Sequence, residues 1–378
     1  MKVTDKLKAI TAAGPDGTKS LLERAIVTTP VVMTVVATIL ASLSNGEMTA
    51  AQYHRSMAAQ FQSKAADQWG FYQAKRLREG SNQNTLELLE GLVGPGNFDA
   101  RSFPSLTQQA RQLSNMTLEP DAAALKGLLA QADAESRTLS QQWDQALADP
   151  AVADAVRDLG GDGLPTVAEK KVDVPAIADV LKAIEAGKSE TETVPLVLAV
   201  KREDLDQAEA AASANADAFD AATKPIIAAI DRIGFLVTAE TTTLRRLQRD
   251  IAADVSPDAA ANLQLLREAG SLRQAADDLM SGFSAARLRF DARRYHQESA
   301  YNSAIAQLYE VEVRRSGGES DRNRVRSKNF FYGMLVAQMA VTIATFSLAV
   351  RQRSLLWGLA SGAGVIAIGL GVYVYAFT

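Results

Sequence analysis

Cysteine is absent from the 378-residue chain, and histidine occurs only at His54 and His296. Without cysteine the chain has no disulfide bond, no thiolate nucleophile and no zinc or iron–sulfur site with cysteine ligands. Neither histidine has a glutamate three residues before it, so the Glu-x-x-His pair of a di-metal helical bundle is missing. We therefore expect no cofactor and no metal site, and we expect both histidines to lie on a surface or between packed helices.

Sequence motifs for nucleotide binding and hydrolysis are also missing. There is no Gly-x-x-x-x-Gly-Lys-Ser/Thr loop to hold phosphates and no Gly-x-Ser-x-Gly turn to present a serine nucleophile. The formal net charge of −4 gives no reason to expect a nucleic-acid partner. These absences predict a protein that is not an enzyme and does not bind nucleic acid.

Charged residues are absent from three long apolar segments, residues 25–43, 329–350 and 355–377. A helix that crosses a bilayer needs about 20 such residues. The segments therefore predict three transmembrane helices: one after an N-terminal tail of residues 1–24, and two in a C-terminal hairpin around the link 351–354. A cleaved signal peptide is the alternative interpretation of the first segment. The lack of charge inside all three segments argues against a pump or transporter.

Three crossings would place the N-terminus and the link on one side of the membrane and residues 44–328 on the other. Basic residues are nearly equal in number on the two sides, so the positive-inside rule does not decide the orientation. Because the first helix usually dominates orientation, an extracytoplasmic position for residues 44–328 is slightly favoured. We expect a multi-pass protein of a bacterial inner (cytoplasmic) membrane.

Two heptad patterns run through the polar middle of the chain. Apolar residues recur at steps of four and three from Ile226 to Ile251, with Glu240 as the one polar position, and again from Leu265 to Phe290. This spacing is typical of helices that pack along one seam. The sequence therefore predicts an all-α fold, in which three transmembrane helices anchor a long helical hairpin or coiled-coil bundle.

The expected hairpin has three interruptions. Ser256 and Pro257 predict a turn between the two seams, because serine is a favoured N-cap and proline fits the first turn of a helix. Gly317 and Gly318 predict a break between the second helix and the membrane. Proline and glycine in residues 159–198 predict a loop-rich part without an assigned role.

Aromatic residues gather in the polar stretch of residues 65–79, "AADQWGFYQAKRLRE". On a helix, Trp69 and Tyr72 share one face, whereas Phe71 points elsewhere. Packing against another helix is the first interpretation of this pair. Contact with a membrane surface and a specific ligand site remain alternatives.

Two further groups of residues are candidate contact sites. Six cations precede the second apolar segment and could attract anionic lipid headgroups or act only as a topology signal. Gly358 and Gly362 stand one turn apart in the third segment, which favours close helix packing within the hairpin or against a partner subunit. The six cations are Arg314, Arg315, Arg322, Arg324, Arg326 and Lys328.

The segments "ADQWGFYQAKRLR" and "RYHQESAYNSAIAQLYEVEVRRS", with the apolar hairpin that follows, resemble bacterial membrane proteins of the domain-of-unknown-function 4337 type. The resemblance covers residues 20–80 and 285–376, and residues 95–280 read as an expansion outside it. It implies three membrane spans and an aromatic helix after the first. It supplies no catalytic residue, cofactor or substrate.

Together these features favour a structural protein. We expect a non-enzymatic membrane scaffold, tether or assembly protein, whose partners are membrane lipids and further copies of itself. The alternative is an accessory subunit of a larger respiratory, photosynthetic or transport complex. A signal transducer that uses the Gly317–Gly318 break is a third possibility, but the sequence shows no output domain.

Overall fold

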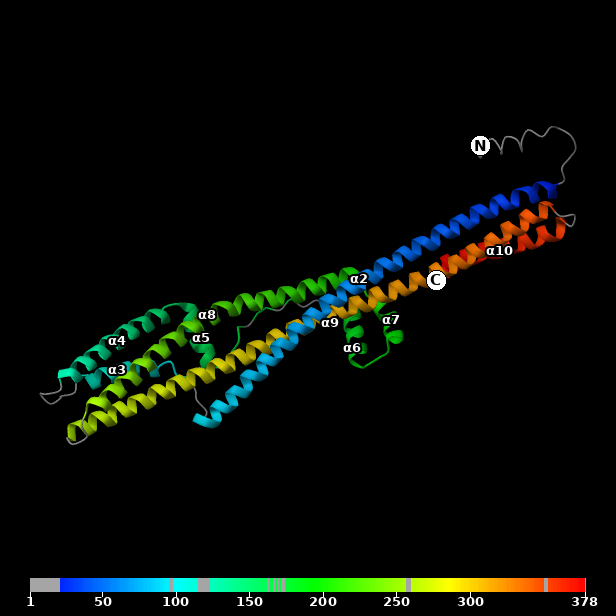
Figure 1. The fold of residues 1–378 in the computed structure, drawn as a ribbon. Coiled ribbons are helices and arrows are strands. Elements are labelled where there is room, and N and C mark those ends of the chain that lie inside the picture. The colour runs from blue at the N-terminus through cyan, green and yellow to red at the C-terminus, as the bar shows by residue number, and fades with distance from the viewer. Residues whose placement is uncertain are drawn as a thin grey trace. The chain divides into compact units, whose positions relative to one another are not determined.

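The computed structural model describes residues 21–94, 98–114, 123–161, 163–165, 167–168, 170, 174–255, 260–349 and 353–377. Every helix or strand within these ranges is an α-helix, which confirms the all-α prediction (Figure 1). The predicted turn at Ser256 and Pro257, most of the predicted N-terminal tail, and residues 351 and 352 of the predicted link lie outside the described part.

The helices form two compact units. The first unit comprises the described residues up to Phe61, with Ala183–Ala199 and the residues from Val311 onward; the second comprises Gln62–Lys182 and Val200–Glu310. Two long helices, α2 and α9, contribute residues to both. The helices are α2 (Leu21–Val93), α3 (Ser102–Ser114), α4 (Ala123–Leu147), α5 (Pro150–Gly160), α6 (Pro175–Glu185), α7 (Glu190–Ala199), α8 (Arg202–Asp254), α9 (Ala260–Ala349) and α10 (Arg353–Phe377).

In the second unit, α8 and α9 run antiparallel, because residue numbers on one helix fall as those of their partners on the other rise. Near one end, Arg245 of α8 forms an ion pair with Asp277 of α9. Farther along, the rings of Phe219 and Tyr301 lie 5.6 Å apart, and the Tyr309 hydroxyl donates a 2.6 Å hydrogen bond to Glu209. The predicted pairing of the two heptad helices is therefore present.

The two predicted seams form the core of this unit. All sixteen seam positions, including the polar Glu240, are buried. Helices α4 and α5 pack on α8, and α3 packs on α4, which the sequence did not predict. In this added layer Trp143 is 1% exposed and stacks on Phe103 at 4.2 Å. The seam residues are Ile226, Ile230, Ile233, Val237, Glu240, Leu244, Leu247, Ile251, Leu265, Ala269, Leu272, Ala276, Leu279, Phe283, Ala286 and Phe290.

The prediction of a break at Gly317 and Gly318 is wrong, because α9 continues through both glycines. Glycine costs about 1 kcal/mol relative to alanine inside a helix, an amount that packing readily outweighs. Here Gly318 lies against Val194 and Leu198 of α7, which a Cβ atom at Gly318 would meet at 3.6 Å. Gly318 therefore lies at the contact between α7 and α9, where a Cβ atom would make an ordinary van der Waals contact.

The part predicted to be loop-rich, residues 159–198, holds two short helices. Helix α6 ends at Glu185 and is followed by Gly187, which has a φ of 68°, and the Lys188 amide donates to the Ala183 carbonyl at 3.1 Å. This is the glycine-terminated end that many helices use. Helix α7 is preceded by Ser189, whose amide and hydroxyl both donate to Glu192. Those hydrogen bonds hold the pKa of Glu192 below its usual value.

In the first unit the apolar part of α2 packs with α9 and α10. Pairs such as Trp357 with Thr29 and Gly364 with Met33 show that α10 runs parallel to α2. Helix α9 runs antiparallel to α2: the hydroxyl groups of Ser44 and Ser327 each donate to the other residue's carbonyl, at 2.9 and 2.8 Å. These two buried serines lie where the apolar residues of α2 and α9 give way to polar ones.

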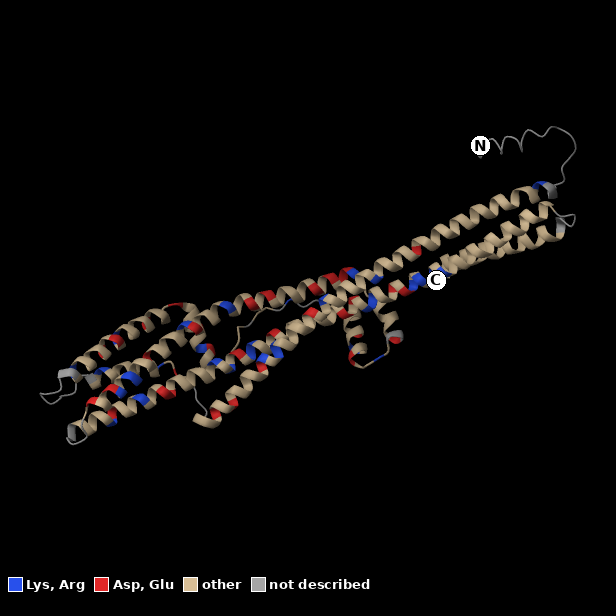
Figure 2. Ribbon diagram, viewed as in Figure 1, with Lys and Arg blue, Asp and Glu red and all other residues tan. Residues whose placement is uncertain are grey.

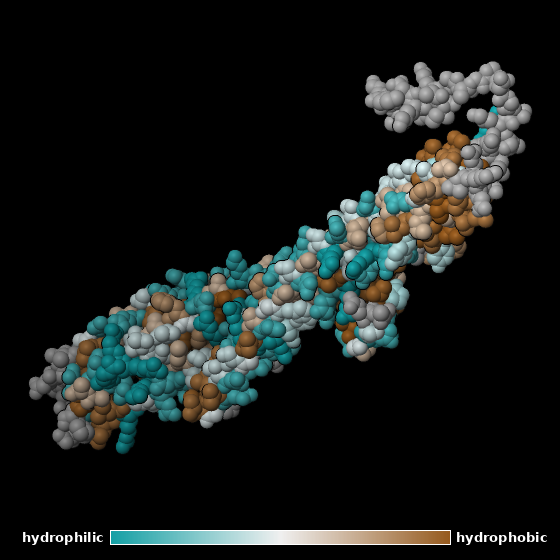
Figure 3. All heavy atoms as spheres, turned by 45° about the vertical axis from the view of Figure 1, so that its right-hand side comes forward, coloured by the Kyte–Doolittle hydropathy of each residue, from teal (hydrophilic) through white to brown (hydrophobic). Residues whose placement is uncertain are grey.

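Side-chain size is distributed in this bundle in an unusual way. The buried positions are largely small, whereas large apolar side chains such as Val31, Phe346 and Val365 are 63–71% exposed. Charged residues are confined to the polar parts of the helices, and the hydrophobic surface gathers over the apolar bundle (Figures 2 and 3). The small buried residues include Ala37, Ala337, Ala340, Ala344, Ala360, Gly364 and Ala367.

A seven-residue repeat of small residues also follows the facing sides of α2 and α9. In the first unit Ser44 and Ala51 of α2 contact Ser327 and Ser320 of α9. The spacing is that of a heptad, and the small side chains let the two backbones approach closely. The residues at this spacing are Ala37, Ser44, Ala51, Ala58 and Ala65 on α2, and Ala285, Ala292, Ser299, Ala306, Ser320 and Ser327 on α9, where the larger Val313 stands between Ala306 and Ser320.

Candidate functional site

The aromatic stretch of α2 lies against α9 in the second unit. The Trp69 indole nitrogen donates a 2.8 Å hydrogen bond to Glu310, and the Tyr72 ring meets the Trp69 ring edge-on at 5.3 Å. Both rings are half-buried, whereas Phe71 is 56% exposed. Trp69 and Tyr72 thus share one face, and Trp69 bonds to a neighbouring helix.

Replacing Trp69 by Phe should lower the free energy of unfolding by about 1–2 kcal/mol. The change keeps most of the ring contact but removes the hydrogen bond to the Glu310 carboxylate. Urea unfolding of the full-length protein in mild detergent, followed by circular dichroism, measures the difference. Phe71→Leu is the matched control, because the exposed ring of Phe71 should be worth less than about 0.5 kcal/mol. Equal effects of the two changes would contradict a role for the bond.

Beyond the aromatic pair, charged residues continue the contact between α2 and α9. Lys75 forms an ion pair with Glu298, and the buried carboxylate of Glu79 lies 3.1 Å from the Nδ1 atom of His296. Arg76 bonds to both Glu79 and His296. In the first unit His54 makes a similar cross-helix pair with Glu319 at 2.8 Å. Both histidines thus contact acidic residues of a neighbouring helix.

Nothing in these charged pairs forms a metal centre. No group of three or more His, Cys, Asp or Glu side chains that could hold a metal ion occurs among the described residues. The arrangement joins opposite charges across two helices, and such pairs fix helix register more than they provide chemistry.

Several of the six cations predicted to contact lipid interact within the chain. Arg314 donates to Thr193 of α7 at 3.2 Å, and Arg315 pairs with Glu319 at 3.2 Å. Arg326 lies 3.9 Å from Glu47 of α2. The other three, Arg322, Arg324 and Lys328, are exposed on α9.

Gly358 and Gly362 do not pack within the bundle. A Cβ atom at either position would meet nothing within 4 Å, so the expected contact inside the hairpin is absent. Gly364 and Gly371 of the same helix pack against α2 instead: a Cβ atom at Gly364 would lie 2.5 Å from the Met33 sulfur, and one at Gly371 would lie 2.9 Å from the Leu40 side chain. The spacing of Gly358 and Gly362 correctly indicated close packing of α10 but indicated the wrong face of that helix. The spacing of small residues does not show on which side of a helix its neighbour lies.

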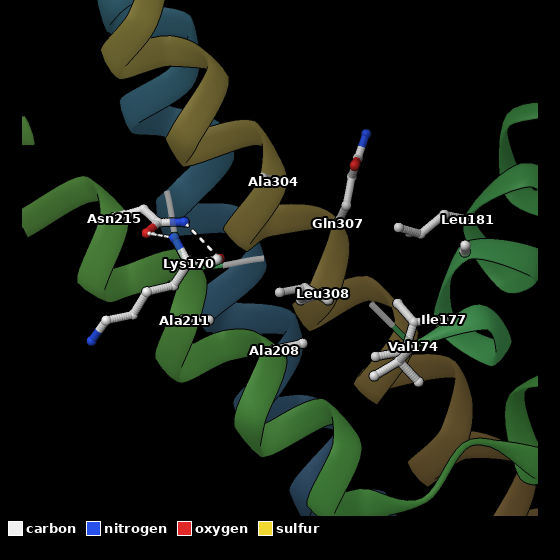
Figure 4. A pocket seen from close by; sticks show the side chains of 12 residues that line it. Lys170, Val174, Ile177, Leu181, Ala208, Ala211, Asn215, Ala304, Gln307 and Leu308 are labelled. Atoms are coloured by element: carbon white, nitrogen blue, oxygen red, sulfur yellow. Dashed lines mark hydrogen bonds between the residues drawn. The ribbon is translucent and has the colours of Figure 1, made fainter. Parts of the chain in front are cut away.

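A cleft of about 280 Å³ lies in the second unit between α6, α8 and α9 (Figure 4). At one end, the Asn215 amide both accepts from the Lys170 backbone amide and donates to its carbonyl, at 2.8 and 3.1 Å. Alanines of α8 and aliphatic side chains such as Ile177 and Leu181 of α6 form most of the walls. The lining offers no acid–base pair, so the cleft suits apolar contact rather than proton transfer.

Glu240 is the functional group that sequence reasoning did not single out as a site. It occupies a buried seam position of α8, and the hydroxyl of Ser136 on α4 donates to one of its carboxylate oxygens at 3.2 Å. Burial raises the pKa of this carboxyl to about 7, against the opposing effect of the Ser136 hydrogen bond. Nearby Glu135 raises it further. The single polar residue in an otherwise apolar heptad pattern was the signal that could have pointed to it.

Comparison with known proteins gives one match. No curated protein and no solved structure matches the chain. A family model matches one stretch of the chain, which includes the aromatic segment of α2 and continues through α3 and α4 into α5. The match therefore extends into residues 95–153, which we had interpreted as an expansion outside the resemblance. It does not include residues 285–376. The resemblance is confirmed over residues 22–153, which match the domain of unknown function DUF4337.

Proposed function

We propose that the chain is a multi-pass integral membrane protein in which the apolar parts of α2, α9 and α10 cross the bilayer. Among the described residues, three helices contain a stretch long and apolar enough to do so. The observation that carries the proposal is the size distribution in the bundle, in which most buried residues are small and most of the large apolar side chains are exposed. Helices in lipid pack through small residues in this way, because lipid solvates large apolar side chains.

The hydroxyl groups of the bundle support the same proposal. Thr34 and Thr38 donate to carbonyls one turn earlier in α2, at 2.8 and 2.9 Å, and Thr342 and Thr345 of α9 do likewise at 3.0 and 2.8 Å. A polar group in hydrocarbon must find its partner within the protein. Exposed threonines that satisfy their own hydroxyl groups fit a lipid-facing surface.

For the second unit we propose a non-enzymatic role as a scaffold, tether or assembly factor. Several of its charged side chains form pairs between helices, such as Arg245 with Asp277, Arg287 with Asp231 and Lys75 with Glu298. A long helical surface held by such pairs suits binding to other proteins. The bacterial inner membrane and an extracytoplasmic second unit remain part of the proposal.

An accessory subunit of a larger membrane complex is the second candidate. The open face of α10 at Gly358 and Gly362 favours it, because small residues allow a foreign helix to approach closely. Leucine at both positions should then release the protein from its partners without changing its own fold.

The test is the native mass and composition of the protein extracted from its own membrane in mild detergent. A particle made only of this chain supports the scaffold. Defined additional subunits support the accessory role, and their loss in the Gly358→Leu/Gly362→Leu variant would locate the contact. Release of the wild-type chain by alkaline carbonate would contradict membrane insertion itself.

A further inference from the structure

We propose that Arg324 and Lys328 of α9 bind the phosphate group of an anionic phospholipid, with its acyl chains along the apolar surface that follows Tyr332. The inference rests on the proposed membrane insertion and adds a ligand class to it. It concerns the first unit alone.

The spacing of these residues places them in one row along α9. Arg324, Lys328 and Tyr332 are each four residues apart, so they lie on the same face of the helix. Arg324 and Lys328 are exposed, and the Lys328 ammonium lies 5.8 Å from the centre of the Tyr332 ring. The ring is itself 48% exposed. Two cations and an interfacial aromatic residue thus share one open surface.

The same row continues as apolar surface. Leu335, Met339 and Phe346 follow Tyr332 at steps of three, four and seven residues, and they are 39%, 63% and 63% exposed. The order along the helix is therefore cation, cation, aromatic ring, apolar side chains. A phospholipid presents the matching order of phosphate, interface and acyl chain.

Arg324 and Lys328 also lie close to the point on α9 where the apolar bundle begins. Ser327, next to Lys328, bonds to Ser44 where the polar parts of both helices end, and Phe330 is buried in the apolar bundle. At 1.5 Å per residue, Lys328 lies about 3 Å and Arg324 about 9 Å before Phe330 along the helix axis. Long basic side chains at this position reach the headgroup layer.

The charge balance favours an anionic lipid over a zwitterionic one. Neither Arg324 nor Lys328 forms an ion pair with another described residue, and the nearby carboxylate of Glu47 faces Arg326 instead. Two unneutralised cations next to the bilayer are attracted to anionic headgroups, each by an amount that salt reduces. Phosphatidylglycerol is therefore the probe of choice, and phosphatidylcholine its neutral counterpart.

The experiment is lipid titration of the full-length protein in mild detergent, read by native mass spectrometry. For wild type we expect phosphatidylglycerol to bind more tightly than phosphatidylcholine, and the preference to shrink at high salt. Arg324→Gln/Lys328→Gln should weaken phosphatidylglycerol binding roughly 10- to 30-fold and leave phosphatidylcholine binding unchanged. The matched control is Lys126→Gln/Arg249→Gln, which removes two exposed cations of the second unit and should bind phosphatidylglycerol as wild type does.

Three results would overturn the proposal. The first is unchanged phosphatidylglycerol affinity in the double variant. The second is binding of inorganic phosphate to wild type as tight as that of phosphatidylglycerol, which would assign the pair to a soluble anion. The third is a double variant that binds phosphatidylglycerol with unchanged affinity but has the opposite orientation in the membrane, which would make the cations a topology signal. Thiol labelling of Ser81→Cys in the otherwise cysteine-free chain measures that orientation. In each case, resistance of the wild-type protein to carbonate extraction would still support the proposed membrane insertion.

Discussion

Replacing Glu240 by Gln should abolish a fall in stability that the wild-type second unit undergoes between about pH 5 and pH 8. The carboxyl is buried in the α8 seam, and its pKa is raised from 4.5 to about 7. In the unfolded chain the same group titrates at its ordinary value. Between the two values the folded protein holds a proton that the unfolded protein has released, so stability falls as pH rises.

The size of the effect follows from the separation of the two pKa values. Each pH unit in that window is worth about 1.4 kcal/mol, so the full difference is ~3 kcal/mol. The loss begins above the unfolded pKa of 4.5 and is complete above about pH 7. Glutamine should retain the Ser136 hydrogen bond to its carbonyl oxygen and cannot ionise. At pH 8 the variant should therefore be more stable than wild type by a few kcal/mol.

Urea unfolding of the full-length protein in mild detergent, at pH 5 and pH 8, measures this difference. Trp143 in the core of the second unit reports it by fluorescence when Trp69 and Trp357 are both replaced by Phe. Glu87→Gln is the control, because Glu87 is an exposed carboxylate of the same unit and is not among the groups that shift the pKa of Glu240. A pH dependence that survives Glu240→Gln would contradict the assignment.

Replacing Gly364 by Leu should destabilise the apolar bundle, whereas the same change at Gly358 should not. At Gly364 the added side chain would enter the space of Met33, whose sulfur lies 2.5 Å from the position of a Cβ atom. Met33 can shift in part, and overpacking of this kind costs about 1–3 kcal/mol. At Gly358 the side chain would project into open space.

Trp357 provides the readout, because its indole nitrogen bonds to Thr29 across the same pair of helices at 2.9 Å. In a chain with Trp69 and Trp143 replaced by Phe, we expect its fluorescence transition on heating in detergent to occur at lower temperature for Gly364→Leu than for the parent chain. Gly358→Leu, which carries the same added volume on the same helix, should match the parent. Identical transitions for both variants would show that α2 and α10 do not pack through Gly364.

Much of the fold could be predicted from the periodic spacing of apolar residues in the sequence. The seams from Ile226 to Ile251 and from Leu265 to Phe290 were predicted residue by residue, because burial along a helix pair repeats every 3.5 residues and leaves a strong pattern. The three apolar stretches were equally plain, because length and lack of charge alone identify them. The packing of α3, α4 and α5 into a layer on α8 was not predicted, because an amphipathic pattern does not reveal which surface a helix covers.

The contact sites were harder to predict for a physical reason. Gly358, Gly362 and Gly364 look alike in sequence, and only the direction of each missing Cβ atom separates the open pair from the packed residue. In the basic run, Arg326 and Lys328 are two residues apart, yet one faces Glu47 and the other faces outward. Which cation is neutralised depends on the neighbouring helix, and composition carries no information about it.

The small-residue repeat between α2 and α9 limits how this protein can change length during evolution. Ser44 and Ala51 meet Ser327 and Ser320, and small residues recur at seven-residue spacing on both helices, except at Val313 of α9. One residue inserted into α2 would turn every later side chain by 100° and move the small face away from α9. Insertions or deletions of seven residues, matched in both helices, keep the faces together. Relatives that differ in helix length should therefore differ by multiples of seven.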